Sequence, residues 1–438
     1  MNGKKFTLGL AVLTLGCGLS FAQESTLASG LENTTKWHSL FGSTHRKLAK
    51  EAMKRIDKNV YPDIERMADQ LREGAYSESG HQNFWKDNGG FPKDLWGKGD
   101  KKNSGGVLGN YEAFKTQEAY KNIGRICHLT QDQAVPAHAA NIQHLTSEGM
   151  EAWADWDFQL GQVPEIDPSK QPYEYYQDQQ DDTRSRLSTW VNPVTGVPYW
   201  VAPMTAKSGE DVTMGTRGAY GGGKDTYSEW IDDNNNNFEG NSNNRKLVTK
   251  MPEICSERLG TSVGYTKAVM IAASNRLPPL VKDIKVVPNV VLPGGKADIF
   301  FTAMDNKSRS VKYTITITGP AGTETLTEGE IPLNKPMPIS YNNNNYSNNN
   351  QPETTAENFM FYRGNKAAWN GTIGGKPLAE GAYTIEVQLT DEDGNMVPED
   401  VNTDSVRDND TKIALNVVNV APKALADISV SFDTPLGR

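Results

Sequence analysis

The spacing of apolar residues changes near residues 277–288, and this change divides the chain into two parts. Before it, apolar residues recur at three- and four-residue steps, as at Leu48, Ala52 and Ile56. Such steps predict amphipathic helices. We expect helices from Thr44 onward, over 111–132 and over 256–275. The last should stop before Pro278, because proline cannot continue a helix.

After Pro279 the period becomes two, which is typical of short strands with one buried face. Three segments alternate in this way: 311–317, 383–389 and 413–417. Together with turn sequences between them they predict a β-sandwich. The fold class expected is therefore multidomain α + β, an all-α multi-helix domain followed by an all-β sandwich. The asparagine-rich segment 342–350 should pack poorly.

The first 22 residues resemble an export signal. Lys4 and Lys5 precede a short apolar run, and Ser20-Phe21-Ala22 offers a cleavage site. We expect a secreted or periplasmic chain without a transmembrane anchor after signal removal, because no later stretch holds 18 apolar residues without charges. A lipoprotein attached through Cys17 is the alternative. In an oxidising compartment, a disulfide between Cys127 and Cys255 is then one alternative.

Length and charge narrow the function further. The chain has 438 residues, enough for two or three domains. Its formal net charge of -9 argues against a general nucleic-acid binder, which usually carries a basic face. It does not exclude an enzyme that cleaves a phosphodiester.

The histidines carry the functional signal, because all six lie before residue 145. His128 and Asp132 are four residues apart, so on a helix they share one face. His144 and Glu148 repeat this spacing, and Pro136 should end the first helix and let His138 turn back toward the same centre. Imidazole and carboxylate together suit zinc, or less selectively another borderline divalent ion.

Two further groups lie upstream. His45 opens a predicted helix, where a helix-terminal histidine is as good an interpretation as a metal ligand. Glu78 and His81 lie in a glycine-containing loop and are further candidate metal ligands.

The pattern His128-x3-Asp132-x5-His138, with Pro136-Ala137-His138-Ala139-Ala140-Asn141 and His144-x3-Glu148, resembles the secreted bacterial zinc-dependent phospholipase C family of the alpha-toxin type. The resemblance covers roughly residues 37–276 and implies a compact helical domain around three zinc ions. It assigns His138, His144 and Glu148 to one zinc, and His81, His128 and Asp132 to a second. Asp132 would bridge to a third, held also by His45 and by the main-chain amino and carbonyl groups of Trp37.

The Trp37 assignment requires removal of residues 23–36 as a propeptide. The zinc domain would then span 37–280, with 184–250 as an irregular insertion rich in glycine and asparagine.

This resemblance implies a phospholipase C that acts on a phospholipid at a membrane or micelle surface, with no nucleic acid as substrate. Zinc-activated water would cleave the glycerol-side phosphodiester to diacylglycerol and a phosphorylated head group, with Glu78 as the general base. Tyr76, Phe84 and Trp85 are candidates for an aromatic head-group site, and core packing is the other interpretation. Two alternatives stay open: a zinc-dependent single-strand nuclease/3′-nucleotidase, and a non-catalytic metal-binding surface adhesion protein.

Residues 286–422 resemble the immunoglobulin-like repeats of flagellar hook-capping proteins. The resemblance rests on Trp369-Asn370-Gly371, Gly381-Ala382-Tyr383-Thr384-Ile385 and Asp391-Glu392-Asp393-Gly394-Asn395. It implies a spacer or adhesion module, followed by a tail over 423–438. The spacing of Asp391, Asp393 and Asn395 stops short of a full calcium loop, so a plain turn is expected.

Overall fold

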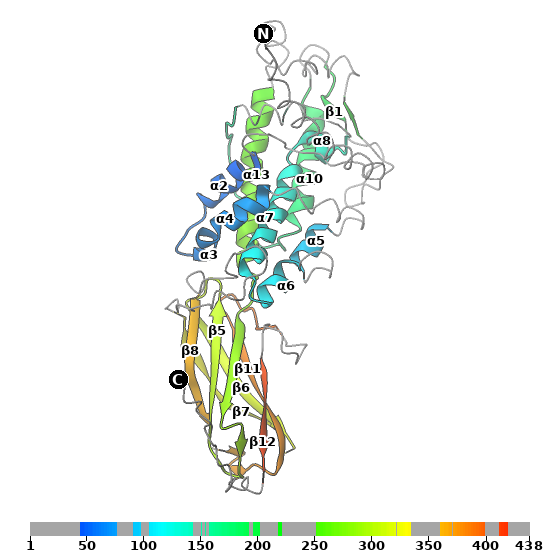
Figure 1. Cartoon of the computed structure of the whole chain (residues 1–438). Helices are drawn as coiled ribbons and strands as arrows, with labels where there is room; N and C mark the ends of the chain where they lie inside the picture. Colours follow the sequence, from blue (N-terminus) through cyan, green and yellow to red (C-terminus); the bar gives the residue numbers. More distant parts are fainter. Residues whose placement is uncertain are drawn as a thin grey trace, which may run out of the picture. The chain divides into compact units, whose positions relative to one another are not determined.

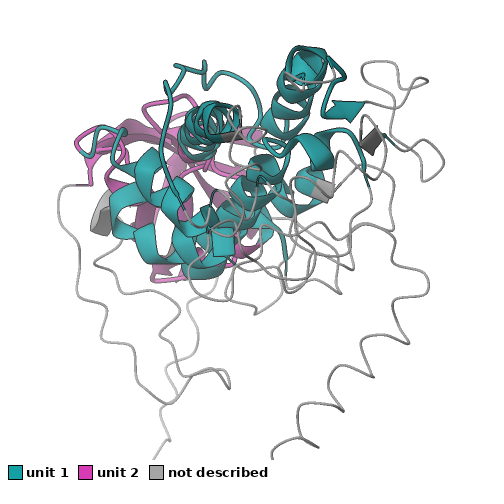
Figure 2. Ribbon diagram, turned by 90° about the horizontal axis from the view of Figure 1, so that it is seen from above, with its two compact units in different colours: residues 1–58, 64–109, 117–273 teal, residues 59–63, 110–116, 274–438 magenta. Residues whose placement is uncertain are grey.

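The computed structural model describes residues 44–76, 91–97, 105–142, 150, 154, 157–191, 196–201, 218–220, 251–320, 322–333, 360–369, 371–398 and 411–418. These residues form both helices and strands (Figure 1), so the prediction of a mixed α + β chain is confirmed. The chain divides into two compact units (Figure 2). Unit 1 comprises 1–58, 64–109 and 117–273, and unit 2 comprises 59–63, 110–116 and 274–438.

Most of the helices belong to unit 1. Their bounds are α2 (Thr44–Met53), α3 (Pro62–Arg66), α4 (Ala68–Tyr76), α5 (Phe91–Trp96), α6 (Val107–Glu112), α7 (Thr116–Asp132), α8 (Pro136–Ala139), α10 (Tyr175–Arg186) and α13 (Met251–Ser274). The apolar face predicted for the first helix is buried, with Leu48, Ala49 and Ala52 fully enclosed. Hydrophobic burial of this stripe is what holds a short helix in place.

Helices α4 and α7 meet at two glycines. A Cβ atom added to Gly74 would overlap the carbonyl oxygen of Lys121 and lie 2.9 Å from the Cα of Gly124. A Cβ added to Gly124 would in turn overlap the carbonyl oxygen of Leu71. The two backbones therefore touch directly, and no side chain fits between them.

The continuous helix predicted over 111–132 is wrong. The chain forms α6 up to Glu112, breaks, and begins α7 at Thr116. Phe114 has a φ of 59°, the left-handed conformation, which cannot continue a right-handed helix. Its amide donates to Tyr111 O, and Lys115 donates to Asn110 O, which closes α6. The third predicted helix begins earlier than expected, at Met251, and ends at Ser274.

The region predicted as an irregular insertion over 184–250 also differs from the expectation where it is described. Helix α10 continues to Arg186 and is followed by a 3₁₀ turn, Leu187–Thr189. Strands β1 (Trp200–Val201) and β2 (Ala219–Tyr220) then pair antiparallel. Trp190, Tyr199 and Trp200 of this segment are buried, Trp200 almost completely, and this burial explains why the described part takes a fixed form. Residues 192–195, 202–217 and 221–250 lie outside the described part.

Unit 2 contains two larger sheets. The first has the order β4-β12-β11-β6-β7 and the second the order β3-β5-β8. The bounds are β3 (Leu280–Val287), β4 (Val290–Val291), β5 (Ala297–Asp305), β6 (Ser310–Gly319), β7 (Gly322–Pro332), β8 (Met360–Trp369), β11 (Gly381–Thr390) and β12 (Lys412–Val417). A short antiparallel pair, β9 (Thr372–Ile373) and β10 (Lys376–Pro377), lies apart from them. Neighbours in the two sheets are antiparallel except β12 and β4, which run parallel.

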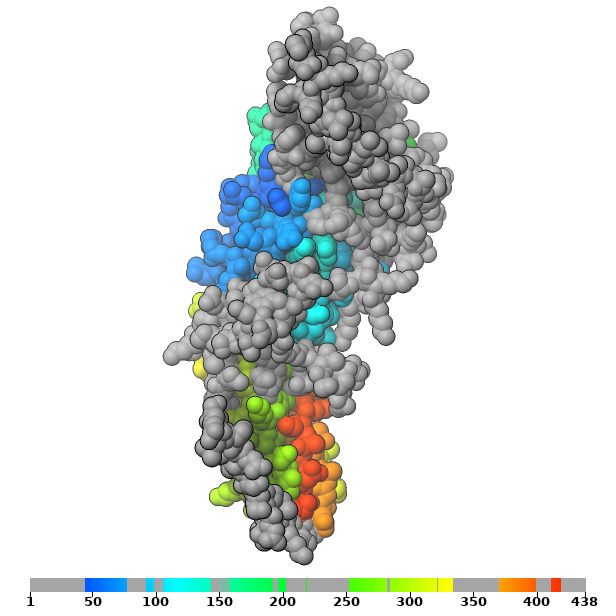
Figure 3. Space-filling model, in the orientation of Figure 1, coloured from blue at the N-terminus to red at the C-terminus, as the bar shows by residue number. Residues whose placement is uncertain are grey.

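The strands predicted from alternation are confirmed as β6, β11 and β12. In β11 the buried residues are Tyr383, Ile385, Val387 and Leu389, with less buried ones between them. One apolar cluster takes residues from both sheets, including Phe301 of β5 and Ile315 of β6. Figure 3 shows β12 (red) at the surface, beside residues of the 371–398 segment (orange).

The predicted turn after β11 is present, since Gly394 donates its amide to Asp391 O and has a φ of 86°. Several predictions fall outside the described residues: the signal peptide over 1–22, the propeptide over 23–36, the asparagine-rich segment and the tail over 423–438. Among the described helices, none combines the length and apolar character needed to cross a bilayer.

Candidate metal centre

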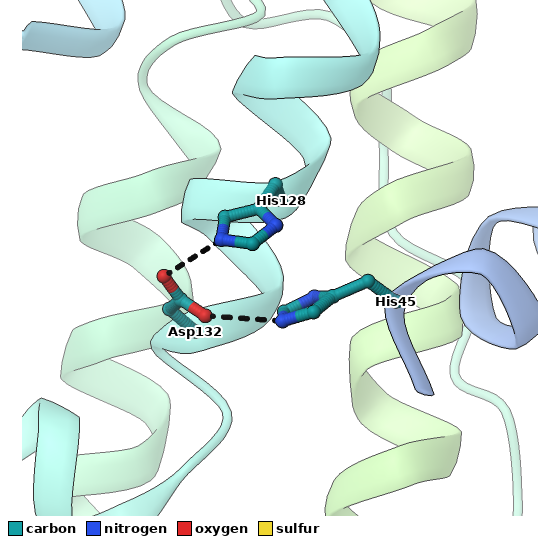
Figure 4. A group of neighbouring side chains, drawn as sticks. All are labelled: His45, His128 and Asp132. Carbon is teal, nitrogen blue, oxygen red and sulfur yellow. Dashed lines mark ion pairs between the residues drawn. The ribbon is translucent and has the colours of Figure 1, made fainter. Parts of the chain in front are cut away.

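Three side chains from two helices converge in unit 1. His128 and Asp132 lie one turn apart on α7, and His45 comes from the first turn of α2 (Figure 4). His45 Nε2 lies 3.4 Å from Asp132 Oδ1, and His128 Nε2 lies 3.5 Å from Asp132 Oδ2. One ligand atom from each residue lies within 4.8 Å of the other two.

The three side chains are buried, with residue exposures of 1 % for His45, 4 % for His128 and 7 % for Asp132. A carboxylate in such a place is costly unless it is paired or binds a cation.

The outer nitrogen of each ring fixes its orientation. His128 Nδ1 is 2.8 Å from the main-chain oxygen of Ala75, at the end of α4. His45 Nδ1 is 2.8 Å from Oε1 of Gln131, the residue before Asp132. Both partners are oxygens that only accept hydrogen bonds, so each Nδ1 carries the proton. In neutral imidazole the lone pair is then on Nε2, and in both rings Nε2 faces the carboxylate.

The distances fit a bound metal ion. Two ligands held at zinc's usual distances with a tetrahedral angle are about 3.3 Å apart. The two separations of 3.4 and 3.5 Å match this value and exceed a normal hydrogen bond. Two imidazoles and a carboxylate are also a donor set that suits zinc. The cluster can therefore bind a metal ion, and each imidazole has its own oxygen of Asp132.

His138 lies next to this cluster. It is on α8, a short helix that begins at Pro136 and places the His138 ring near Asp132. His138 Nδ1 is 3.9 Å from Asp132 Oδ1, and its side chain is 1 % exposed. The structure thus brings together His45, His128 and Asp132, with His138 at their edge.

The other predicted site residues divide into two groups. Trp37, Glu78, His81, Phe84, Trp85, His144 and Glu148 lie outside the described residues. Tyr76 is described and is 47 % exposed, so its ring does not belong to the core. The guanidinium carbon of Arg46 lies 4.0 Å from the centre of the Tyr76 ring, which gives that ring an internal cation partner.

Three contributors were not anticipated from the sequence: Gln131, Thr266 and the carbonyl of Ala75. Gln131 is fully buried and donates from Nε2 to Thr266 Oγ1 on α13, at 3.1 Å. The only sequence signal for Gln131 is its position directly before a candidate metal ligand. No sequence signal marks the Ala75 carbonyl, because every residue has a main-chain carbonyl.

Arg258 is a buried charge elsewhere in unit 1, and it is paired within the protein. Arg258 is fully buried and donates to Asp182 Oδ2 at 2.8 Å and to Thr261 Oγ1 at 2.9 Å. Its guanidinium lies 5.3 Å from the Trp190 ring. This network packs α13 against α10. Cys127 and Cys255 are both buried free thiols in the structure, and burial raises the pKa of Cys127.

Unit 2 holds a buried carboxyl group, Asp305, at the end of β5. Its Oδ1 accepts from the amide of Lys307, yet burial raises its pKa to about 7, helped by the nearby charge of Asp391. Tyr111 is also fully buried, and burial raises its pKa, with Asp305, Asp63 and Asp391 adding to the effect.

Comparison with known proteins identifies no family for this chain. No family model matches, and no curated protein matches. Among solved structures, the chain aligns with a Pseudomonas fluorescens alkylpurine DNA glycosylase, AlkC, bound to DNA that contains an abasic site analogue. The identity is 10 %, the alignment covers 85 % of this chain and 96 % of the other, and the TM-score is 0.18.

That finding corrects the function predicted from the sequence. The aligned protein is named a DNA glycosylase and not a phospholipase, and the prediction of a phospholipase C is withdrawn. At a TM-score of 0.18 the two chains do not share a demonstrated fold, so neither DNA binding nor repair follows for this chain.

Proposed function

We propose that the chain is a zinc-dependent hydrolase of phosphodiesters and that His45, His128 and Asp132 are zinc ligands. The observation that supports this is the direction of the two rings. Both present the lone-pair nitrogen to Asp132, at 3.4 and 3.5 Å. A core histidine pair would need no such common orientation, because a buried ring is satisfied by any two partners.

A zinc ion with three protein ligands and water in the remaining position is the usual arrangement of catalytic zinc sites. Among the described residues, His45, His128 and Asp132 offer three such ligands, and His138 lies beside them. A zinc ion held there would supply a Lewis acid and an acidic water ligand at neutral pH.

The protein's own groups have distinct roles in this proposal. Asp132 provides negative charge through both oxygens, one toward each histidine. The Ala75 carbonyl and Gln131 hold the imidazoles in their ligand tautomers. The surrounding buried residues exclude bulk water, which strengthens every charge interaction within the centre.

The choice of a phosphodiester rests on the resemblance of the 128–148 motif to the superfamily of zinc phospholipases C and single-strand nucleases. Kinship with that superfamily, a set of three zinc ions, and the roles of Trp37, Glu78, His81, His144 and Glu148 are part of the proposal. No lipid head group is assigned. We also propose that residues 1–22 direct export and that unit 2 is an immunoglobulin-like module.

The test combines metal content with hydrolysis. The purified chain is analysed for metal and assayed with bis(p-nitrophenyl) phosphate, the phosphomonoester p-nitrophenyl phosphate and the carboxylic ester p-nitrophenyl acetate. We expect bound zinc, hydrolysis of the diester that a chelator abolishes, and recovery of activity on adding zinc.

His128→Ala should lose metal and diester hydrolysis together, whereas Asp69→Asn, an exposed carboxylate on α4, should keep both. A preparation that binds zinc but hydrolyses none of the three esters would refute the proposed hydrolase activity. Hydrolysis of the carboxylic ester alone would refute the proposal that the substrate is a phosphodiester.

A further inference from the structure

The buried amide of Gln131 connects the metal centre to the helix α13. On one side its Oε1 lies 2.8 Å from His45 Nδ1, and on the other its Nε2 donates to Thr266 Oγ1 at 3.1 Å. Gln131 and Thr266 are both fully buried, and His45 is 1 % exposed. Both ends of the amide therefore have a partner inside the protein, in a place that water does not reach.

We propose that Gln131 is a positioning residue that selects the ligand tautomer of His45. This inference rests on the proposed metal centre and concerns how the centre is kept ready for an ion. Because Oε1 can only accept, it holds the His45 proton on Nδ1 and leaves Nε2 with the lone pair that faces Asp132. The opposite tautomer would place a hydrogen on Nε2, where the ion has to bind.

The Nδ1 atoms of the two histidines donate to different kinds of acceptor. His128 donates to the main-chain oxygen of Ala75, an acceptor that no substitution at residue 75 removes. His45 depends on a side chain, and that side chain is itself held by Thr266. Gln131 is thus a position at which a single exchange removes the acceptor of a ligand ring without changing a ligand.

The first experiment measures zinc affinity by competition with a chromophoric chelator, using the full chain. Gln131→Leu removes the acceptor, and we expect zinc to bind about 10- to 100-fold more weakly, the usual effect of losing a partner of a metal-bound histidine. Gln131→Glu keeps an oxygen facing His45 Nδ1, so its affinity should stay within a few-fold of the parent chain.

Gln133→Leu is the matched control. Gln133 is also buried, two residues further on, but its Oε1 accepts from Gln180 and not from His45 or His128. Its zinc affinity should be unchanged. Equal losses in Gln131→Leu and Gln133→Leu would show a general packing effect and overturn the proposal.

The second measurement does not depend on any variant being stable. Nitrogen-15 spectra of the metal-free chain, labelled at histidine, report which ring nitrogen is protonated, with the His45 signals assigned by a His45→Asn variant. We expect Nδ1–H for His45, and a protonated Nε2 with a bare Nδ1 would overturn the inference.

Neither readout involves hydrolysis. A chain that binds zinc through an oriented His45 but cleaves no ester would refute the proposed function and leave this inference standing.

Discussion

The imidazole rings of His45 and His128 are stacked, with their centres 4.0 Å apart and their planes inclined by 26°. Stacking of this kind suits two neutral rings, because two imidazolium charges at that distance would repel each other. Neutral rings are also the form that binds a metal ion. At this point α2 and α7 therefore contact each other through the two side chains that are proposed to bind the metal ion.

We expect zinc to stabilise the helical unit. An ion that binds the folded state alone, at a free concentration 100 times its Kd, adds about 2.7 kcal/mol to the free energy of unfolding. Thermal unfolding followed by circular dichroism should show a higher midpoint with zinc and a lower one with chelator. Asp132→Asn should abolish the difference, whereas Asp69→Asn should keep it. A midpoint independent of zinc in the parent chain would contradict the metal centre.

The glycine contact between α4 and α7 should be sensitive to one methyl group. Gly74→Ala places a Cβ against the Lys121 carbonyl and forces α4 away from α7. The carbonyl of the next residue, Ala75, would then move away from His128. We expect a loss of about 2 kcal/mol or more in stability, together with weaker zinc binding.

Gly97→Ala is the control for that change, since the nearest atom to its added Cβ is 3.6 Å away, an ordinary contact. Chemical denaturation and zinc titration of both variants give the comparison. Unchanged zinc affinity in a folded Gly74→Ala chain would show that the helix crossing does not set the position of the ring.

Arg258 should contribute far more to stability than its neighbour Arg186, although both bind Asp182. The Arg258 side chain is fully buried, whereas that of Arg186 is 46 % exposed. Arg258→Met removes the buried hydrogen bonds to Asp182 and Thr261, and we expect about 2 kcal/mol of destabilisation. Arg186→Met breaks a solvent-screened pair and should cost under about 1 kcal/mol. Urea denaturation measures both, and similar losses would refute the assignment of the network to the Arg258 side chain.

Asp305 should make the stability of unit 2 fall as the pH rises. Its folded pKa of about 7 lies above the ordinary 3.8, so the folded state holds the proton more tightly. The stabilisation is complete below pH 4 and is lost as the pH rises through about 7. A difference of this size corresponds to at most about 4 kcal/mol. Asp391, whose pKa burial also raises, acts in the same direction.

Asp305→Asn should flatten this dependence while an amide oxygen still accepts from Lys307. Asp298→Asn, a half-buried residue of the same strand, should leave the dependence in place. Unfolding of the chain at pH 4, 6 and 8 provides the measurement. Identical profiles for the parent chain and Asp305→Asn would exclude Asp305 as the source.

Local spacing was enough to predict part of this architecture. The alternation in β11 reports burial because successive side chains of a strand point to opposite faces. The four-residue step from His128 to Asp132 likewise places two groups on one face of α7. Neither argument extends to His45, which comes from another helix and was linked to the centre only through family resemblance.

Other features depend on contacts that leave no local pattern. The left-handed Phe114, which separates α6 from α7, lies in a sequence whose apolar spacing continues smoothly across the break. The hydrogen bond between Gln131 and Thr266 depends on the packing of α7 against α13, which are far apart in the sequence. The phospholipase C prediction is withdrawn, and the proposed function keeps only the zinc ligands and the phosphodiester from the motif that suggested it.

The Ala75 carbonyl and the Gln131 amide hold equivalent rings but are not equally open to mutation. A codon change at residue 75 leaves the peptide oxygen in place, whereas one at residue 131 replaces the acceptor itself. Natural variation at residue 131 can therefore tune the His45 side of the centre, whereas variation at residue 75 leaves the acceptor of His128 in place. Homologous chains adapted to different zinc supplies are expected to differ first at residue 131.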